Sequence, residues 1–190
     1  MGVEIGAKFA FFEADQKTLD YLDGRTRGKA KRPVGLFKAD PDARYEQVYE
    51  IDISHLEPQV ACPHDVGNVR PISQVGDIKV DQAFLGSCTN GRFEDLEIAA
   101  TILKGKRVHS ETRLIVFPAS WEIYLDALRA GILEALIEAG AVVCNPGCGP
   151  AWAGIWAEVY LASPATVAAS AVAGKIVDPR QDMRMEEKRR

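Results

Sequence analysis

The sequence predicts an α/β domain built as three layers, helix–sheet–helix, around a mainly parallel sheet. After position 81, short apolar runs bounded by turn residues alternate with segments of helical period. Strands that alternate with helices in this way are joined by crossover connections, and these connections produce parallel sheets. A chain of 190 residues fits one sizeable domain with one hydrophobic core. We therefore expect residues 1–190 to form a single domain with a frayed tail at 181–190.

Three strands and their helices are expected in order along the second half of the chain. The first strand has 83–85 as its last residues, the second covers 114–117 and the third covers 141–144. Each is a short apolar run. A last helix over 165–173 follows a serine–proline pair, which is typical of a helix start, and stops at Gly174. The intervening helices are marked by apolar residues at helical spacing, first Leu96, Ala99, Ala100 and Leu103, then Leu125, Leu128, Leu133, Leu136 and Ile137, with Gly140 at the end.

The first third of the chain is less regular. Asp15 is a candidate N-cap for a helix that Gly24 is expected to end. Residues 45–53 place Tyr49, Ile51 and Ile53 on one side and Val48, Glu50 and Asp52 on the other, and this alternation predicts a strand. Three prolines then mark a long connecting segment, at Pro58, Pro63 and Pro71.

Charge and composition exclude several classes of function. The formal net charge of −4 and the pI near 5.5 give no broad attraction to nucleic acid or to an anionic membrane. No apolar run approaches the roughly 20 residues that cross a bilayer, so we expect a cytoplasmic protein. The four cysteines are too few for a disulfide scaffold of this length. A site for a small molecule or a metal is therefore the expected function.

Two glycine-rich loops follow the first and third strands. Residues 86–91 contain Cys88, and residues 145–150 contain Cys148. Because the carboxyl ends of parallel strands meet at one edge of a sheet, we expect the two cysteines to approach one another there. Inward-facing N–H groups and the hydroxyl of Ser87 or Thr89 would suit a thiolate-bound metal. Two cysteines complete neither an iron–sulfur nor a zinc ligand set, so incidental cysteines in tight turns remain an alternative.

The segments GSCTNGRFEDLEIAATILKGKRV, IVFPAS, EAGAVVCNPGCGP and YLASPATVAASAVAGKI, with MGVEIGAK and LEPQVACPH before them, resemble the aconitase superfamily. Within it, they are most similar to the large subunits of 3-isopropylmalate dehydratase and homoaconitase. The resemblance implies a [4Fe–4S] cluster held by three cysteines, two of them at Cys88 and Cys148. It also implies a cluster environment from Ser87, Thr89 and Asn90.

The same resemblance implies a reaction. In this family the open iron of the cluster acts as a Lewis acid on a hydroxy dicarboxylate, and bases remove a neighbouring proton. The active-site carboxylate would be Glu4. For 3-isopropylmalate dehydratase the reaction interconverts 2- and 3-isopropylmalate in leucine biosynthesis. The implied partners are a small subunit and the remaining domains of the large subunit.

The sequence departs from the family after Cys148. The family motif CGPC has its third cluster cysteine where this chain has Ala151, and a loop with a substrate-binding arginine is shortened to a junction at about 151–158. We therefore expect the chain alone to be inactive, because such residues act as a unit. A cluster-free structural domain, including an engineered minimal one, and a homoaconitase fragment are the alternatives. Cys144 is expected to be a buried, inert thiol, and a separate metal pair of Cys62 with His64 is a weaker hypothesis.

Overall fold

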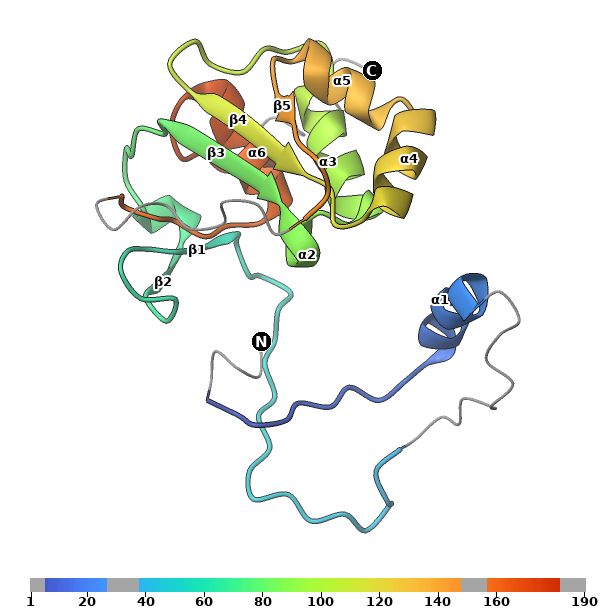
Figure 1. Cartoon of the computed structure of the whole chain (residues 1–190). Helices are drawn as coiled ribbons and strands as arrows, with labels where there is room; N and C mark the ends of the chain where they lie inside the picture. Colours follow the sequence, from blue (N-terminus) through green and yellow to red (C-terminus); the bar gives the residue numbers. More distant parts are fainter. Residues whose placement is uncertain (1–5, 27–37, 148–156, 182–190) are drawn as a thin grey trace. The chain divides into compact units, whose positions relative to one another are not determined.

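The computed structural model describes residues 6–26, 38–147 and 157–181 (Figure 1). Contacts along the chain divide it into two units, residues 1–54 and residues 55–190. The expectation of a single domain over 1–190 stays a prediction. The expected junction lies largely outside the described residues, and the expected frayed tail does so beyond residue 181.

The first unit contains helix α1, Gln16–Thr26. Asp15 starts it as expected, because its Oδ1 accepts a hydrogen bond of 2.9 Å from the backbone N–H of Thr18. That bond holds the pKa of Asp15 below its ordinary value. The predicted end at Gly24 is wrong by two residues, since α1 continues to Thr26.

The strand predicted over residues 45–53 is not formed. The segment is irregular and every residue in it is exposed. A strand is stable only when its backbone groups find a neighbouring strand, and the sheets of the described residues contain only other segments. The alternation of side chains in 45–53 is therefore not accompanied by pairing with another strand among the described residues.

The second unit is built on a parallel sheet, as predicted. Its strands are β3 (Gln82–Gly86), β4 (Arg113–Phe117) and β5 (Val142–Val143), in the order β3-β4-β5. Leu85 lies beside Val116, and Val116 beside Val143, so the three carboxyl ends lie along one edge (Figure 1). The predicted α/β class is confirmed.

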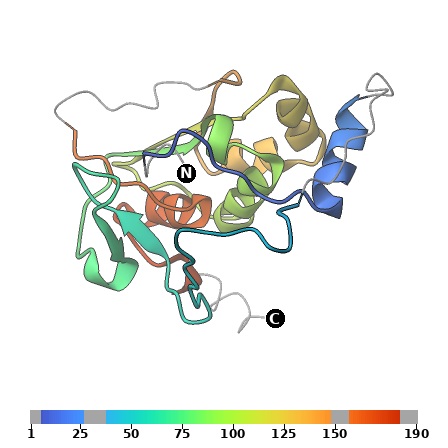
Figure 2. The same ribbon diagram turned by 90° about the horizontal axis from the view of Figure 1, so that it is seen from below.

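Four helices accompany the sheet: α3 (Phe93–Leu103), α4 (Trp121–Arg129), α5 (Ile132–Glu138) and α6 (Pro164–Ala173). Helices α3 and α6 pack against each other and against β3 on one face of the sheet (Figures 1 and 2). Helix α5 joins α3 beside β5, and α4 packs on α5. The core between them contains the predicted helix residues Leu96, Ala99, Ala100, Leu103, Leu133 and Leu136, together with Leu85, Leu114 and Val116 from the strands.

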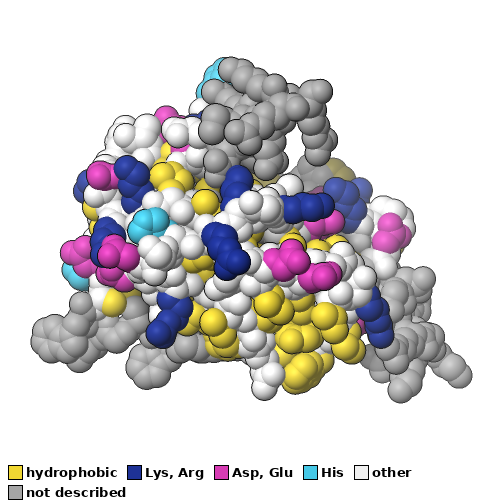
Figure 3. Space-filling view, turned by 90° about the horizontal axis from the view of Figure 1, so that it is seen from above, with side chains coloured by type: hydrophobic (Ala, Val, Ile, Leu, Met, Phe, Trp, Pro, Cys, Tyr) yellow, Lys and Arg dark blue, Asp and Glu magenta, His cyan; other side chains and the backbone are white. Residues whose placement is uncertain are grey.

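The opposite face of the sheet carries Phe84, Ile115, Phe117 and Val142. The rings of Phe84 and Phe117 stack with centroids 5.3 Å apart, and Val142 is exposed. Figure 3 looks down on the view of Figure 1 and shows hydrophobic side chains gathered at its lower edge, the side toward which the sheet faces. Within the described part of the second unit, helices cover the other face, so the second helical layer of the predicted three is not among these residues.

A small antiparallel pair lies where a connecting segment was predicted. Strands β1 (Gln59–Ala61) and β2 (Val69–Pro71) pair with each other, and the short 3-10 helix η1 (Ile72–Gln74) follows. Ala61 also exchanges two backbone hydrogen bonds of 2.9 Å with Leu161. The connecting segment thus contains a short strand pair that the prolines gave no sign of, because proline at the end of a short edge strand is compatible with pairing.

The last helix follows its predicted signals closely. The Oγ of Ser163 accepts a hydrogen bond of 3.2 Å from the N–H of Thr166, and Pro164 occupies the first turn. Gly174 ends α6 with φ of 73°, a left-handed conformation that glycine adopts without strain. Among the helices of the described residues, none combines the length and the apolar character needed to cross a membrane.

We expect a modest acid-dependent loss of stability from the exposed ion pair between Lys79 and Glu111. Lys79 Nζ lies 3.1 Å from Glu111 Oε2, and the hydrogen bond between them raises the pKa of Lys79 and lowers that of Glu111. A lowered carboxyl pKa gives stability that is present above the ordinary value of 4.5 and is lost as the pH falls through the folded-state pKa. Both groups are well exposed, so the effect is small and salt screens it.

Thermal unfolding measured between about pH 6 and pH 3 tests this expectation. Glu111→Gln should flatten the pH dependence at low salt, and Glu138→Gln, which removes an exposed carboxylate from α5, serves as the control. Equal pH profiles for the two variants would contradict the assignment.

Candidate metal centre

The turn after β3 is set by two glycines packed against the end of β4. Gly86 has φ of 125°, and a Cβ there would overlap the carbonyl oxygen of Phe117. A Cβ on Gly91 would overlap the same oxygen and come within 2.6 Å of the carbonyl oxygen of Ser87. Only residues without a side chain let the loop approach the neighbouring backbone this closely. The close packing of this loop against the end of β4 therefore explains why the GSCTNG segment has glycine at positions 86 and 91.

Between these glycines lies the one-turn helix α2, Ser87–Asn90. Ser87 has φ of 72°, the left-handed region that costs a non-glycine residue of order 1–3 kcal/mol. It is also buried, and its Oγ lies 3.2 Å from Thr89 Oγ1. The strained residue directly before Cys88 turns the chain out of the strand, and Cys88 is exposed as a result. Sequence patterns did not predict this helical turn.

The loop after β5 reaches the same edge of the sheet. The N–H of Cys144 donates 2.8 Å to the carbonyl oxygen of Val116, which continues the parallel pairing past β5. Beyond it, Gly147 N–H donates 3.3 Å to Pro118 O, and Ala119 N–H donates 2.9 Å to Gly91 O. These backbone bonds connect the loops after all three strands. The predicted convergence at the carboxyl edge is thus observed as far as residue 147.

The predicted site residues fall into two groups. Ser87, Cys88, Thr89 and Asn90 lie together on α2 at this edge, Ser87 buried and the other three exposed. Their role in binding a cofactor stays a prediction. The other predicted residues, the carboxylate Glu4 and the ligand Cys148, lie outside the described residues, as does Ala151.

Cys144 is a further cysteine at the carboxyl edge of the sheet that the sequence analysis did not expect to be accessible. The sequence predicts a buried thiol there, but the side chain is half-buried and follows directly on β5. Its accessibility had no signal in the pattern, because a cysteine at a strand end reads like any small core residue. Cys88 and Cys144 are the two described thiols on loops at the carboxyl edge.

The described residues contain no group of three or more His, Cys, Asp or Glu side chains that could hold a metal. The resemblance stated above implies a cluster held by three thiolates. The third thiolate position of the family motif is Ala151, whose methyl group cannot ligate iron. The chain therefore lacks a thiol at the third position of the CGPC motif.

A separate hollow lies beside the predicted pair of Cys62 and His64. Its volume is about 200 Å³, and its walls come from residues 61–66 and from Ala157, Val159 and Leu161. Cys62 is half-buried, and its Sγ lies 3.9 Å from the carbonyl oxygen of Val60. Partial burial raises the pKa of nearby Tyr160, and the negative charge of Glu158 adds to that shift. No third ligand joins Cys62 and His64 among the described residues, so the separate metal pair stays a hypothesis.

The known proteins most similar to this chain that are named here are large subunits of 3-isopropylmalate dehydratases and of a homoaconitase. At 47% identity, a 3-isopropylmalate dehydratase large subunit 1 from Methanopyrus kandleri covers 95% of this chain and 48% of its own length. A probable methanogen homoaconitase large subunit from Methanothermobacter thermautotrophicus is 47% identical over 96% of the chain, and a 3-isopropylmalate dehydratase large subunit from Moorella thermoacetica is 44% identical over 95%. The chain spans about half the length of these relatives.

The alignments also contain a deletion. The match to the Methanopyrus kandleri protein extends over 205 residues, whereas the chain has 190, so at least 15 aligned positions have no counterpart here. Members of the aconitase family bind a [4Fe–4S] cluster. The family's pattern (aconitate hydratase) matches this chain over residues 1–77 and 73–174, and with nearly the whole length accounted for, the chain belongs to the aconitase family.

Proposed function

We propose that this chain is the cluster-edge domain of a cytoplasmic hydro-lyase large subunit of the 3-isopropylmalate dehydratase type, and that it is inactive alone. The observation that carries the proposal is the GSCTNG turn. Its glycines, strained serine and exposed Cys88 form a tightly built loop at the carboxyl edge of a sheet. The similarity to dehydratase and homoaconitase large subunits over about 95% of the chain supports the same proposal.

The proposed substrates are hydroxy dicarboxylates such as 2- and 3-isopropylmalate, and the proposed partners are a small subunit and the rest of a large subunit. When bound, a cluster supplies a Lewis-acidic iron for the departing hydroxyl. In this chain Cys88 would be one ligand, Cys148 a second, and Glu4 the carboxylate nearby. With Ala151 at the third position, the chain holds too few of these groups to complete the reaction alone.

A cluster-free structural role is the second candidate. It is favoured by Ala151, because the family's CGPC motif has a cluster cysteine at that position and alanine cannot ligate iron. The two candidates share the fold and differ in whether Cys88 binds iron. A homoaconitase origin is equally compatible with the relatives, since one of them bears that name at the same identity.

The test of the proposed function is turnover after anaerobic incubation with iron and sulfide. The purified chain is mixed with 2- or 3-isopropylmalate, and the appearance of the other isomer is followed by chromatography. We expect no turnover from the chain alone. Isomerisation by the chain alone, abolished in Cys88→Ser, would contradict the proposal, because it would show a complete active site in these 190 residues.

A further inference from the structure

Helix α4 carries apolar side chains on two of its sides. It packs on α5 and α3, and its inner residues Ile123 and Ala127 are buried. Trp121, Leu125 and Leu128 lie on the other side and are 59%, 44% and 51% exposed. Spacings of four and three residues place these three side chains in one row along the helix, and we call this row the α4 stripe. One apolar side is enough to hold a helix on a core, so the packing of α4 on its described neighbours does not account for the stripe.

The α4 stripe differs from ordinary exposed apolar residues in two ways. Single apolar residues are scattered over every protein surface, whereas a contiguous row that includes a tryptophan is typical of a protein–protein contact. The tryptophan is also restrained, because its ring contacts the half-buried ring of Tyr124 with centroids 5.5 Å apart. A side chain that is already restrained loses less entropy on binding. Figure 1 shows α4 at the edge of the second unit, with α3 on its inner side.

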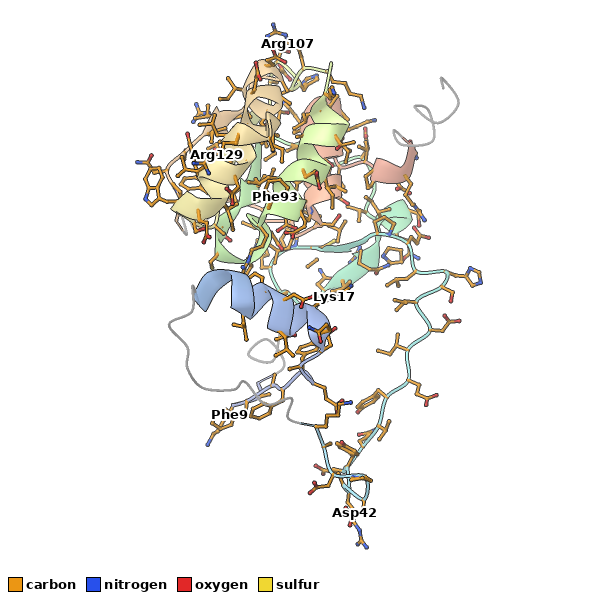
Figure 4. The ribbon with its side chains drawn as sticks, turned by 90° about the vertical axis from the view of Figure 1, so that its right-hand side faces the viewer. Phe9, Lys17, Asp42, Phe93, Arg107 and Arg129 are labelled. Atoms are coloured by element: carbon orange, nitrogen blue, oxygen red, sulfur yellow. The ribbon has the colours of Figure 1, made fainter. Side chains whose placement is uncertain are left out.

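Two opposite charges lie along one flank of the α4 stripe. Glu122 is in the first turn of α4 and Arg129 is in the last, and a separation of about two turns places them on the same flank. Figure 4 shows Arg129 on the outer side of α4, away from α3 and its labelled Phe93. Arg129 Nη1 lies 3.4 Å from Asp126 Oδ1, but both side chains of this ion pair are well exposed, so the pair holds the guanidinium only weakly. The flank is therefore negative at one end and positive at the other.

This pattern of apolar and charged side chains is complementary to itself. Two copies of α4 that run antiparallel, with Leu125 facing Leu125, place each Trp121 opposite Arg129 of the other copy, and an arginine packs well on an indole ring. A two-fold axis also brings the same flank of both helices together, so each Glu122 lies beside Arg129 of the other copy. A parallel pair would instead set like charges against each other, which is destabilising. The charges therefore favour a second copy, in antiparallel orientation, as the occupant of the stripe.

We propose that two copies of this chain associate through the α4 stripe as an antiparallel, two-fold symmetric helix pair. Each copy buries Trp121, Leu125 and Leu128 against the other, and an ion pair between Glu122 and Arg129 closes each end of the contact. Helix α4 has nine residues, so the contact is smaller than the roughly 1,600 Å² of a standard interface and the dimer is weak. The inference goes beyond the proposed function, because the contact needs neither iron nor substrate.

Sedimentation velocity of the purified full chain tests the proposal. Between about 1 and about 500 µM, we expect the sedimentation coefficient to rise from that of a monomer to that of a dimer. It should rise no further, because an interface with two-fold symmetry closes at two copies.

Two variants locate the contact. Leu125→Glu should raise the dissociation constant at least about tenfold, because it sets two carboxylates against each other at the centre of the interface. Ile51→Lys also gives an exposed apolar position a charge, but it lies outside α4 and should change the dissociation constant by less than about twofold.

Reversing the charges tests the antiparallel orientation. Glu122→Arg alone sets arginine against arginine, and Arg129→Glu alone sets glutamate against glutamate, so each variant should dimerise at least about fivefold more weakly than the unchanged chain. In an equimolar mixture of the two variants, every charged contact between unlike copies joins an arginine to a glutamate. We expect the mixture to associate about as readily as the unchanged chain.

Four results would overturn the inference. They are a chain that stays monomeric over the whole concentration range, a dimer that Leu125→Glu leaves intact, a dimer that Ile51→Lys abolishes, and a mixture of the charge variants that associates no better than its components. Circular dichroism checks that every variant is folded, which we expect because all the substituted side chains are exposed.

Discussion

Replacing Gly86 by alanine is expected to cost more than about 4 kcal/mol and to leave little folded protein. Two effects add at this position. Its φ of 125° lies in a region that residues with a Cβ rarely adopt, and the added Cβ would overlap the carbonyl oxygen of Phe117. The overlapped atom is backbone of the next strand and cannot rotate away as a side chain would. The penalty would be a large share of the about 5–15 kcal/mol that stabilises a typical domain.

A matched control separates the two effects. Gly105 also has a positive φ, 70°, but a Cβ there would have nothing within 4 Å. Gly105→Ala should therefore cost only about 1–2 kcal/mol, the conformational penalty alone. Urea unfolding followed by circular dichroism gives both values. Equal losses in the two variants would show that the close approach of the GSCTNG turn to β4 is not present in solution.

The second large effect is expected from Ala151→Cys. This change places a thiol at the third position of the family's CGPC motif, after Cys148. Because a cubane needs three protein thiolates, iron bound after anaerobic reconstitution should rise at least about twofold over the unchanged chain, with sulfide rising in parallel. The rise should disappear when Cys88→Ser is combined with it.

Ala153→Cys is the control for this experiment. It adds the same thiol two residues outside the motif position, so it tests whether any extra cysteine in this loop binds iron. We expect its iron content to match that of the unchanged chain. Equal uptake by both cysteine variants would mean that the motif position has no special role, and no uptake by Ala151→Cys would refute the missing-ligand explanation.

The sequence predicted the elements whose signals are local. Helix α6 has its serine cap, its proline and its terminal glycine at the expected places, and α3 buries the four apolar residues that its period indicated. The three strands were evident because each is an apolar run between turn residues. The meeting of their loops at one edge followed from parallel topology, and two backbone hydrogen bonds bear it out as far as residue 147: Ala119 N–H donates to Gly91 O, and Gly147 N–H donates to Pro118 O.

The errors arise where structure depends on distant or absent partners. Residues 45–53 have the side-chain pattern of a strand but no strand beside them among the described residues. Conversely, β1 and β2 pair with each other inside a segment that prolines marked as a connection, and Ala61 also bridges to Leu161, a hundred residues away in sequence. The left-handed Ser87 was not predictable either, since its φ is imposed by the packing of Gly86 and Gly91 against β4.

We propose that the chain retains the fold and the edge cysteine Cys88 of a dehydratase domain but, with Ala151 at the third position of the CGPC motif, does not assemble a full cluster. The most direct test is the iron and sulfide content of the unchanged chain after anaerobic reconstitution and desalting. We predict well below about four iron atoms and four sulfides per folded chain. A content of about four of each, lost in Cys88→Ser, would contradict the proposal and require a third ligand from outside the CGPC motif position.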